Sequence, residues 1–306
     1  MAAALALILV GMAPNIASLG LSLFLFGATV GGLDVAMNSW ATEVEQRRGR
    51  PVMSSLHAMY SVGTGLGAAT GYLAASADLV VSAHFAIAAV LFAAICLWMA
   101  IVDWTFDRPK TARRGPIYVL PKRGLAIVAV VAFCASIGEG GMADWSAIFL
   151  VAVAQVGDAD AALGFTVFSI AMVVARLLGD RFVARVGAIA AGRLSGIAAT
   201  IGVLIAVVFG SFGAALVGFA LMGMGYALIM PLAFSRAASD GTMARGAAIA
   251  SVATLGYGAF MLGPPLIGFI ADATSIRLAF GLLAAFAVLI VIFAKALGSP
   301  KVPQDQ

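Results

Sequence analysis

The residues of this chain best suited to bind a proton or a polar ligand lie inside apolar stretches. Asp34 and Asn38 precede a basic turn near Arg47, and His57 and Tyr60 follow it. Asp34 and Tyr60 are each 13 residues from Arg47, so two antiparallel helices would place them at the same depth. By the same reasoning, Asn38 and His57 lie together, nearer the turn. Because buried acids often relay protons, we interpret these residues as a coupling site; a structural bond between helices is the alternative for Asp34.

A second polar group lies in the sequence CASIGEGGMADWS, at residues 134–146. Counting from about residue 124 at the helical rise, Glu139 lies roughly 22 Å along a helix and Asp144 roughly 30 Å. We therefore expect Glu139 to lie inside the membrane and Asp144 nearer its outer face. Trp145 is placed to stack on a substrate ring or to join an interfacial aromatic belt. Three glycines are expected to weaken or break this helix, as in many transporter sites: Gly138, Gly140 and Gly141.

A third feature, ARLLGDRFVARVG, combines one acid with several arginines at a predicted cytoplasmic helix end. Its charged residues are Arg176, Asp180, Arg181 and Arg185, and Gly179 precedes the acid. We predict a charge network that holds two helices together on the inside and breaks when they part. The alternative is a solvated basic turn, which accounts for the arginines but not for Gly179 and Asp180.

Two sets of helix-breaking residues predict close helix packing. Small residues allow the backbones of two membrane helices to approach each other, and proline adds a kink. The first set recurs every four residues and the second lies late in the chain: Gly63, Gly67 and Gly71, then Gly263, Pro264 and Gly268.

Signals for an enzyme are missing from the sequence. It contains no HExxH, GxSxG or Walker motif, and GTGLGAATG has the wrong spacing for a nucleotide fingerprint. His57 and His84 have no neighbours spaced as metal ligands, and Cys96 and Cys134 both fall in apolar runs. We therefore expect no catalytic activity, no cofactor, no metal and no nucleic-acid partner.

The composition places these residues in a membrane protein. Hydrophobic residues make up 63% of the chain and charged residues only 10%, which is too few for a water-facing surface. The mean hydropathy is +1.08. Crossing a bilayer takes roughly 20 apolar residues in a helix. We predict an all-α bundle of ten helices, at about 1–14, 17–42, 52–75, 81–102, 124–152, 161–179, 189–209, 212–234, 246–271 and 277–296.

The basic residues orient this bundle. With ten helices, all of the 18 Lys and Arg residues except Arg277 fall on one side, which the positive-inside rule assigns to the cytoplasm together with both termini. The longest loop, at 103–123, is basic and contains proline. We expect it to divide a four-helix N-terminal half, 1–102, from a six-helix C-terminal half, 124–306.

The two halves look like copies of each other. At an offset near 195, residues 212–271 align with 17–75, and each copy reads as a Gly-rich helix, a basic turn and a helix carrying Tyr and Gly. Under the same offset, the helices at 124–152 and 161–179 align before residue 1. The first half thus resembles a six-helix repeat without its first two helices, and chance similarity of Gly/Ala-rich helices is the alternative.

At these motifs the chain resembles the major facilitator superfamily, whose members have twelve helices in two halves. RLLGDRFVARVG resembles the conserved loop of that superfamily in its second-half copy. GLDVAMN resembles a segment of the fucose/proton symporter branch in which Asp34 replaces a Glu and Asn38 matches. The following helix resembles that branch too, with His57 and Tyr60 in place of Gln and Asn. Together with GEGGMADWS, the pattern is similar to the YbjJ-type and MosC-type bacterial permeases.

This resemblance implies a multi-pass, monomeric transporter of the bacterial inner membrane, with the lipid bilayer and a small-molecule substrate as partners. We expect a proton-coupled transporter of a sugar, polyol or inositol derivative that works by alternating access. The alternatives are an exporter of apolar, drug-like compounds and, in a different class, a shortened membrane protein that does not transport.

Overall fold

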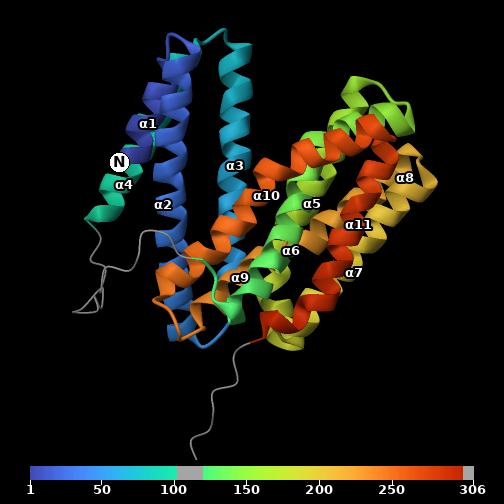
Figure 1. Cartoon of the computed structure of the whole chain (residues 1–306). Helices are drawn as coiled ribbons and strands as arrows, with labels where there is room; N and C mark the ends of the chain where they lie inside the picture. Colours follow the sequence, from blue (N-terminus) through green and yellow to red (C-terminus); the bar gives the residue numbers. More distant parts are fainter. Residues whose placement is uncertain (102–119, 299–306) are drawn as a thin grey trace, which may run out of the picture. The chain divides into compact units, whose positions relative to one another are not determined.

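A computed structural model of the chain describes residues 1–101 and 120–298, and the regular elements in these ranges are helices (Figure 1). In these ranges, 8 helices are long and apolar enough to cross a membrane. The predicted all-α membrane bundle of about ten helices is confirmed. The elements are α1 (Ala2–Gly11), α2 (Ile16–Arg48), α3 (Met53–Ser76), α4 (Val81–Ala100), α5 (Arg123–Ala154), α6 (Asp158–Val186), α7 (Ala188–Phe209), α8 (Phe212–Tyr226), α9 (Ile229–Ala238), α10 (Arg245–Ala273), α11 (Ile276–Phe293) and the 3-10 turn η1 (Ala294–Leu297).

The end of α2 lies later than predicted. The helix runs to Arg48, and Glu43 and Arg47 form an ion pair at 2.6 Å one turn apart on its surface. It ends at Gly49, whose φ of +61° no helical residue adopts, and Pro51 follows. The basic residues near Arg47 therefore belong to the last turn of the helix and not to the loop.

The helix predicted at 212–234 is interrupted, because Pro231 has no N–H to donate to the carbonyl four residues earlier and its ring crowds that carbonyl. The carbonyl belongs to Ala227, which lies between α8 and α9. The interruption leaves the Ala227 oxygen available to a side chain.

The contacts between residues divide the chain into two compact units. Unit 1 consists of 1–37 and 62–115, and unit 2 of 38–61 and 116–306. The loop predicted at 103–123 lies mostly outside the described residues, and the predicted division at that loop stays a prediction.

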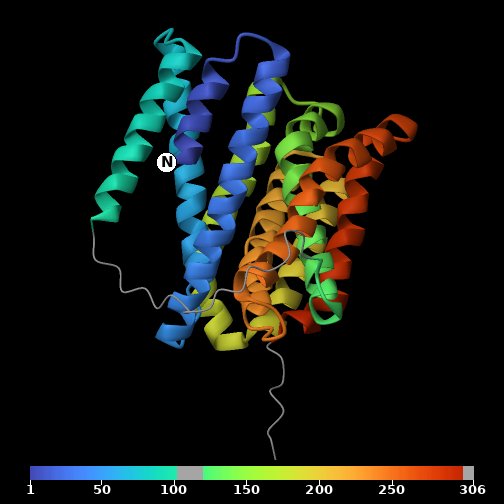
Figure 2. The ribbon, with the colours of Figure 1, turned by 60° about the vertical axis from the view of Figure 1, so that its left-hand side comes forward.

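Unit 1 contains α1, α4 and parts of α2 and α3. α1 packs against α4 (Figures 1 and 2), where Gly11 lies close to Phe85: an added Cβ would lie 3.2 Å from its ring, which is tighter than an ordinary contact. His84 on α4 lies 3.3 Å from the hydroxyl of Thr70 on α3.

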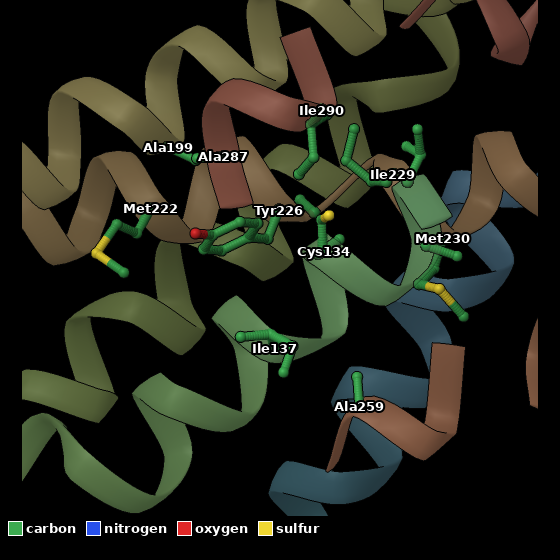
Figure 3. Packing of buried hydrophobic residues seen from close by; sticks show 14 of the residues in the cluster. Cys134, Ile137, Ala199, Met222, Tyr226, Ile229, Met230, Ala259, Ala287 and Ile290 are labelled. Atoms are coloured by element: carbon green, nitrogen blue, oxygen red, sulfur yellow. The ribbon is translucent and has the colours of Figure 1, made fainter. Parts of the chain in front are cut away.

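Unit 2 is built around α5, which packs against α6, α8, α9, α10 and α11. Its core contains a cluster of phenylalanines in which the ring of Phe149 lies 4.5 Å from that of Phe280 and 5.9 Å from that of Phe219. Figure 3 shows Tyr226 among Cys134, Ile137 and other buried apolar residues of this core.

The predicted break in α5 is wrong, because the helix is continuous through its three central glycines. These glycines make room for neighbouring side chains instead. An added Cβ at Gly138 would overlap the ring of Tyr226, and one at Gly140 would lie 3.1 Å from the ring of Phe260. Gly141 is equally crowded by apolar side chains. The glycines therefore serve packing against α8, α10 and α11.

Candidate functional site

The first turn of α3 is held by a carboxylate from the preceding helix. Glu45, near the end of α2, accepts hydrogen bonds from the backbone N–H groups of Val52 at 3.0 Å and Met53 at 3.1 Å. A helix leaves its first four N–H groups without intrahelical partners, and a negative group there also interacts favourably with the helix dipole. Glu45 thus closes the α2–α3 hairpin.

A second carboxylate, from α6, binds the next two N–H groups of α3. Asp180 accepts from the backbone of Ser54 at 3.0 Å and of Ser55 at 2.9 Å, and the Ser55 hydroxyl also donates to it. The amide donors at the start of α3 are therefore shared between one acid of its own hairpin and one acid of a distant helix. This arrangement attaches the residue 38–61 hairpin to the C-terminal helices within unit 2.

Gly179 makes this attachment possible. An added Cβ at Gly179 would overlap the Ser54 hydroxyl and the Leu228 side chain, so α3 approaches α6 closely only because position 179 has no side chain. The Ser54 hydroxyl, which is buried, donates to the backbone carbonyl of Arg176 at 2.9 Å.

Arg176 extends from this contact into the helix bundle and is only 6% exposed. Its Nε donates to the Ala227 carbonyl at 3.2 Å, the oxygen left free by Pro231. Its Nη1 donates to the Ser61 hydroxyl at 2.6 Å, and its Nη2 lies 3.6 Å from the Glu139 carboxylate. One guanidinium therefore links α3, α5 and the break between α8 and α9.

The Glu139 carboxyl group is incompletely satisfied. Its Oε2 faces Arg176, whereas its Oε1 is buried and has no hydrogen-bond partner among the described residues. The hydroxyl of Tyr226, packed on the neighbouring Gly138, is likewise buried without a partner in the described ranges. Buried polar atoms are usually paired, so this region is suited to accept a proton or a polar ligand.

The sequence places Asn38 and His57 at one depth, and the structure brings them together. His57 Nε2 lies 3.1 Å from Asn38 Oδ1, and both residues are buried. The imidazole also packs against the ring of Phe234 on α9, with 5.8 Å between the centroids. Asp34, partly buried, belongs to unit 1, and Tyr60, which is 60% exposed, belongs to unit 2.

The other predicted site residues of α5 and α6 differ from one another in exposure and in what they contact. Asp144 is exposed, and Trp145 packs against Gly268 of α10, where an added Cβ would lie 3.2 Å from the indole. Arg181 and Arg185 are exposed and form no ion pair with any residue the structure describes. The predicted charge network is thus replaced: Asp180 binds backbone amides, and Arg176 binds Glu139.

The predicted packing positions fall into two groups. Gly263 lies against Ile137 of α5, with 3.5 Å from its Cβ position to that side chain, and Pro264 follows inside the continuous α10. By contrast, Cβ positions built on Gly63 and Gly67 have no described atom within 4 Å, and Gly71 has only His84, at 4.0 Å.

A cavity of about 430 Å³ adjoins the attachment of α3. Its lining includes Glu45, Ser54, Asp180 and Arg236, with apolar residues of α6 and α9 between them. Within the described ranges, no group of three His, Cys, Asp or Glu residues is arranged to hold a metal.

A separate polar cluster lies in the loop after α9. Asp240 accepts hydrogen bonds from the Arg236 guanidinium at 3.3 Å and from the Thr242 hydroxyl, and Lys122 donates to the Thr242 carbonyl at 2.9 Å. Burial alone would raise the pKa of the Asp240 carboxyl, but the hydrogen bonds from Thr242 and Arg236 together with the charge of Arg236 outweigh it and lower that pKa. The loop thereby ties α9 to the start of α5.

Sequence reasoning missed several residues of this site: Glu45, Ser54, Ser55, Ser61, Tyr226 and Ala227. A signal was present for two of them. Glu45 lies a few residues before a Gly-Arg-Pro turn, after which a new helix begins whose first backbone N–H groups need an acceptor. Pro231 lacks the N–H group that would otherwise bind the carbonyl of Ala227. The serines carry no such signal, because hydroxyls are common in helices of this composition.

The fold and the buried charges define a polytopic helical membrane protein with a polar centre inside its bundle. The family model described as Major Facilitator Superfamily matches residues 1–242. The chain therefore belongs to the major facilitator superfamily, and it is a membrane transporter and not an enzyme.

Relatives agree with this assignment. The chain is 45% identical over 288 residues to the uncharacterized transporter y4wD of Sinorhizobium fredii (strain NBRC 101917 / NGR234), covering 94% of this chain and 76% of that protein. It is 32% identical over 285 residues to the membrane protein MosC of Rhizobium meliloti, covering 93% and 69%. The predicted resemblance to the superfamily and to MosC is confirmed.

Among solved structures, the chain is similar to the major facilitator superfamily transporter FucP in its outward conformation. The TM-score is 0.76 over 98% of this chain and 80% of that one, at 17% identity. At this low sequence identity, the structural similarity shows a shared fold and nothing about the substrate.

Proposed function

We propose that this protein is a secondary active transporter that moves a small polar solute together with protons by alternating access. The observation that carries the proposal is the Glu139–Arg176 pair inside the helix bundle, 3.6 Å apart and largely buried. Charged residues in a bilayer are unfavourable unless paired, and they mark substrate and proton pathways in transporters. The bacterial inner membrane, with both termini in the cytoplasm, is part of the proposal.

The substrate class we propose is a sugar, polyol or inositol derivative. Hydroxyl-rich solutes need paired donors and acceptors, and the buried amide, imidazole and carboxyl groups of Asn38, His57 and Glu139 provide them. A second solved structure similar in fold, at 15% identity, is described as the E. coli fucose:proton symporter, which makes sugars the first solutes to test. Asp34 is the proposed proton-binding acid, with Tyr60 as a further substrate contact.

The proposed cytoplasmic gate is the attachment of α3 to α6. Breaking it leaves the Ser54 and Ser55 amides to water, and the Glu45 contacts keep the hairpin itself intact. A gate of this kind opens without unfolding either helix, which suits rigid-body rocking of helix bundles.

Uptake by purified protein in proteoliposomes tests the function. A panel of labelled sugars, polyols and inositols is offered with the outside acidic relative to the inside, and at least one is expected to accumulate above its equilibrium level. Asp34→Asn is expected to abolish accumulation while leaving exchange of substrate at equal pH.

Asp78→Asn is the matched control, because Asp78 is an exposed acid of the same unit whose φ of 51° asparagine also tolerates. It is expected to transport like the unmodified protein. Accumulation by folded Asp34→Asn at the unmodified rate would contradict the proton role. Failure of every solute in the panel, with loss of the protein sensitising cells to apolar drugs, would instead favour export.

A further inference from the structure

Arg176 connects the buried acid of α5 to the cytoplasmic attachment of α3. Its backbone carbonyl accepts the Ser54 hydroxyl at 2.9 Å, and its side chain reaches the Ser61 hydroxyl at 2.6 Å. The same guanidinium faces Glu139 at 3.6 Å. Among the described residues, the carboxylate within ion-pair distance of this guanidinium is that of Glu139, and the Ala227 carbonyl at the end of α8 accepts one of its hydrogen bonds.

We infer that Glu139 binds a proton in addition to the proposed site at Asp34, and that protonation of Glu139 releases the α3–α6 attachment through Arg176 and so couples proton binding to opening of the cytoplasmic side. This inference rests on the proposed proton-coupled transport and names the residues that carry the coupling. Arg176 acts as a positioning residue, because it works through Glu139, Ser54 and Ser61.

The physical argument starts from the ionised acid. With Glu139 charged, the guanidinium has its counter-charge and stays between α3, α5 and the end of α8. When Glu139 takes up a proton, its charge disappears and a nearly fully buried cation is left with neutral partners only. A buried charge without a counter-charge is strongly unfavourable, and a state that admits water to it becomes favoured. Separation of α3 from α6 admits that water.

Other ionisable groups near Glu139 do not replace its role. Cys134 is on the same helix, Tyr226 packs from α8 on the neighbouring Gly138, and His57 is on α3. Their side chains are a thiol, a phenol and an imidazole, so none of them supplies a carboxylate. α10 and α11, which also pack against α5, carry Tyr257 near the middle of α10 and place their charged residues near helix ends: Arg245, Asp272 and Arg277.

Protons then move in a defined order. The acid loads its proton while its site faces the acidic side, the cytoplasmic attachment loosens, and the proton leaves toward the less acidic cytoplasm. Loss of the proton restores the carboxylate, which draws Arg176 back and re-forms the attachment. No covalent bond other than that of the transferred proton changes.

A distance measurement across the attachment tests this inference without any substrate. The exposed Gln46 of α2 and Arg245 of α10 lie within 2.7 Å of each other through their side chains, and both belong to unit 2. Gln46→Cys and Arg245→Cys provide spin-label positions, and Cys96→Ser and Cys134→Ala remove the two native thiols. Pulsed electron paramagnetic resonance in nanodiscs reports the attached and separated populations.

Between about pH 8 and about pH 5, the separated population of the labelled protein is expected to rise at least about tenfold relative to the attached one. Glu139→Gln, which mimics the protonated acid, is expected to show the low-pH distribution at every pH. Asp144→Asn, an exposed acid on the same helix, is the matched control and is expected to keep the pH response. Ser61→Ala is expected to raise separation at all pH values and keep the response.

A pH response that persists in Glu139→Gln, or that disappears in Asp144→Asn, would overturn the inference. So would a distance distribution independent of pH in the unmodified background. Because the readout needs no solute, these outcomes are separate from a failed uptake assay. If Asp34→Asn removes proton-driven accumulation while Glu139→Gln leaves the pH response intact, the proposed transport stands and this coupling route does not.

Discussion

Replacing Asp180 by asparagine removes the charge that holds α3 to α6 while keeping the shape of the side chain. Asparagine has one acceptor oxygen, so at least one of the Ser54 and Ser55 amides loses its partner. Hydrogen bonds to charged acceptors contribute about 1.5–3 kcal/mol against about 0.5–1.5 kcal/mol for neutral ones. With three donors on the present carboxylate, we expect Asp180→Asn to weaken the attachment by about 2 kcal/mol, or about 30-fold in population.

The assay is the spin-label distance between positions 46 and 245 at neutral pH. Glu45→Gln is the matched control, because Glu45 binds the same helix end through bonds of similar length but from within the hairpin. It is expected to lower the melting temperature of the protein and to leave the attached fraction nearly unchanged.

Two results would refute this reasoning. One is an attached fraction in Asp180→Asn equal to that of the unmodified protein. The other is an equal loss of attachment in Glu45→Gln, which would mean that α3 is held by its dipole in general and not by the bond to α6.

Two further predictions concern packing and pH. Gly138→Ala is expected to lower the free energy of unfolding in detergent by about 1–3 kcal/mol, because the new Cβ overlaps the Tyr226 ring; Gly258→Ala, with no neighbouring atom within 4 Å among the described residues, is the control and is expected to melt like the unmodified protein. Since the pKa of the Asp240 carboxyl is lower in the folded protein than its ordinary value of 3.8, its charged form stabilises the fold above about pH 4 and this contribution is lost as the pH falls further. The difference in melting temperature between the unmodified protein and Asp240→Asn is expected to be largest near neutral pH and to vanish at acid pH; a difference independent of pH would contradict the role of Arg236 and Thr242 as stabilisers of the charge.

Much of the architecture follows from the sequence, because the bilayer constrains it strongly. Apolar runs of sufficient length predict helices, and basic residues cluster at helix ends and in the connections between helices. The interior breaks were harder to predict. The glycines of α5 suggested an interruption that neighbouring side chains fill instead, whereas Pro231 produces one that was not predicted. A local sequence gives the tendency of a helix to break, and packing decides whether it does.

The Asn38–His57 pair could be predicted from residue spacing alone, since a hairpin of two helices fixes relative depth. Partners from distant helices could not be obtained this way. Nothing in the sequence around Asp180 indicates that its acceptors serve the amides of Ser54 and Ser55, more than a hundred residues earlier. Spacing relates residues only within a hairpin or along one helix.

The sequence by itself therefore determined the class of protein, the helix plan and the acid at position 139 as a buried group. Only the tertiary structure decided what that acid faces, because the direction in which Arg176 points depends on the close approach at Gly179 and on the carbonyl that Pro231 leaves free. Charges in a membrane must find partners, but which partners they find is set by how the helices pack.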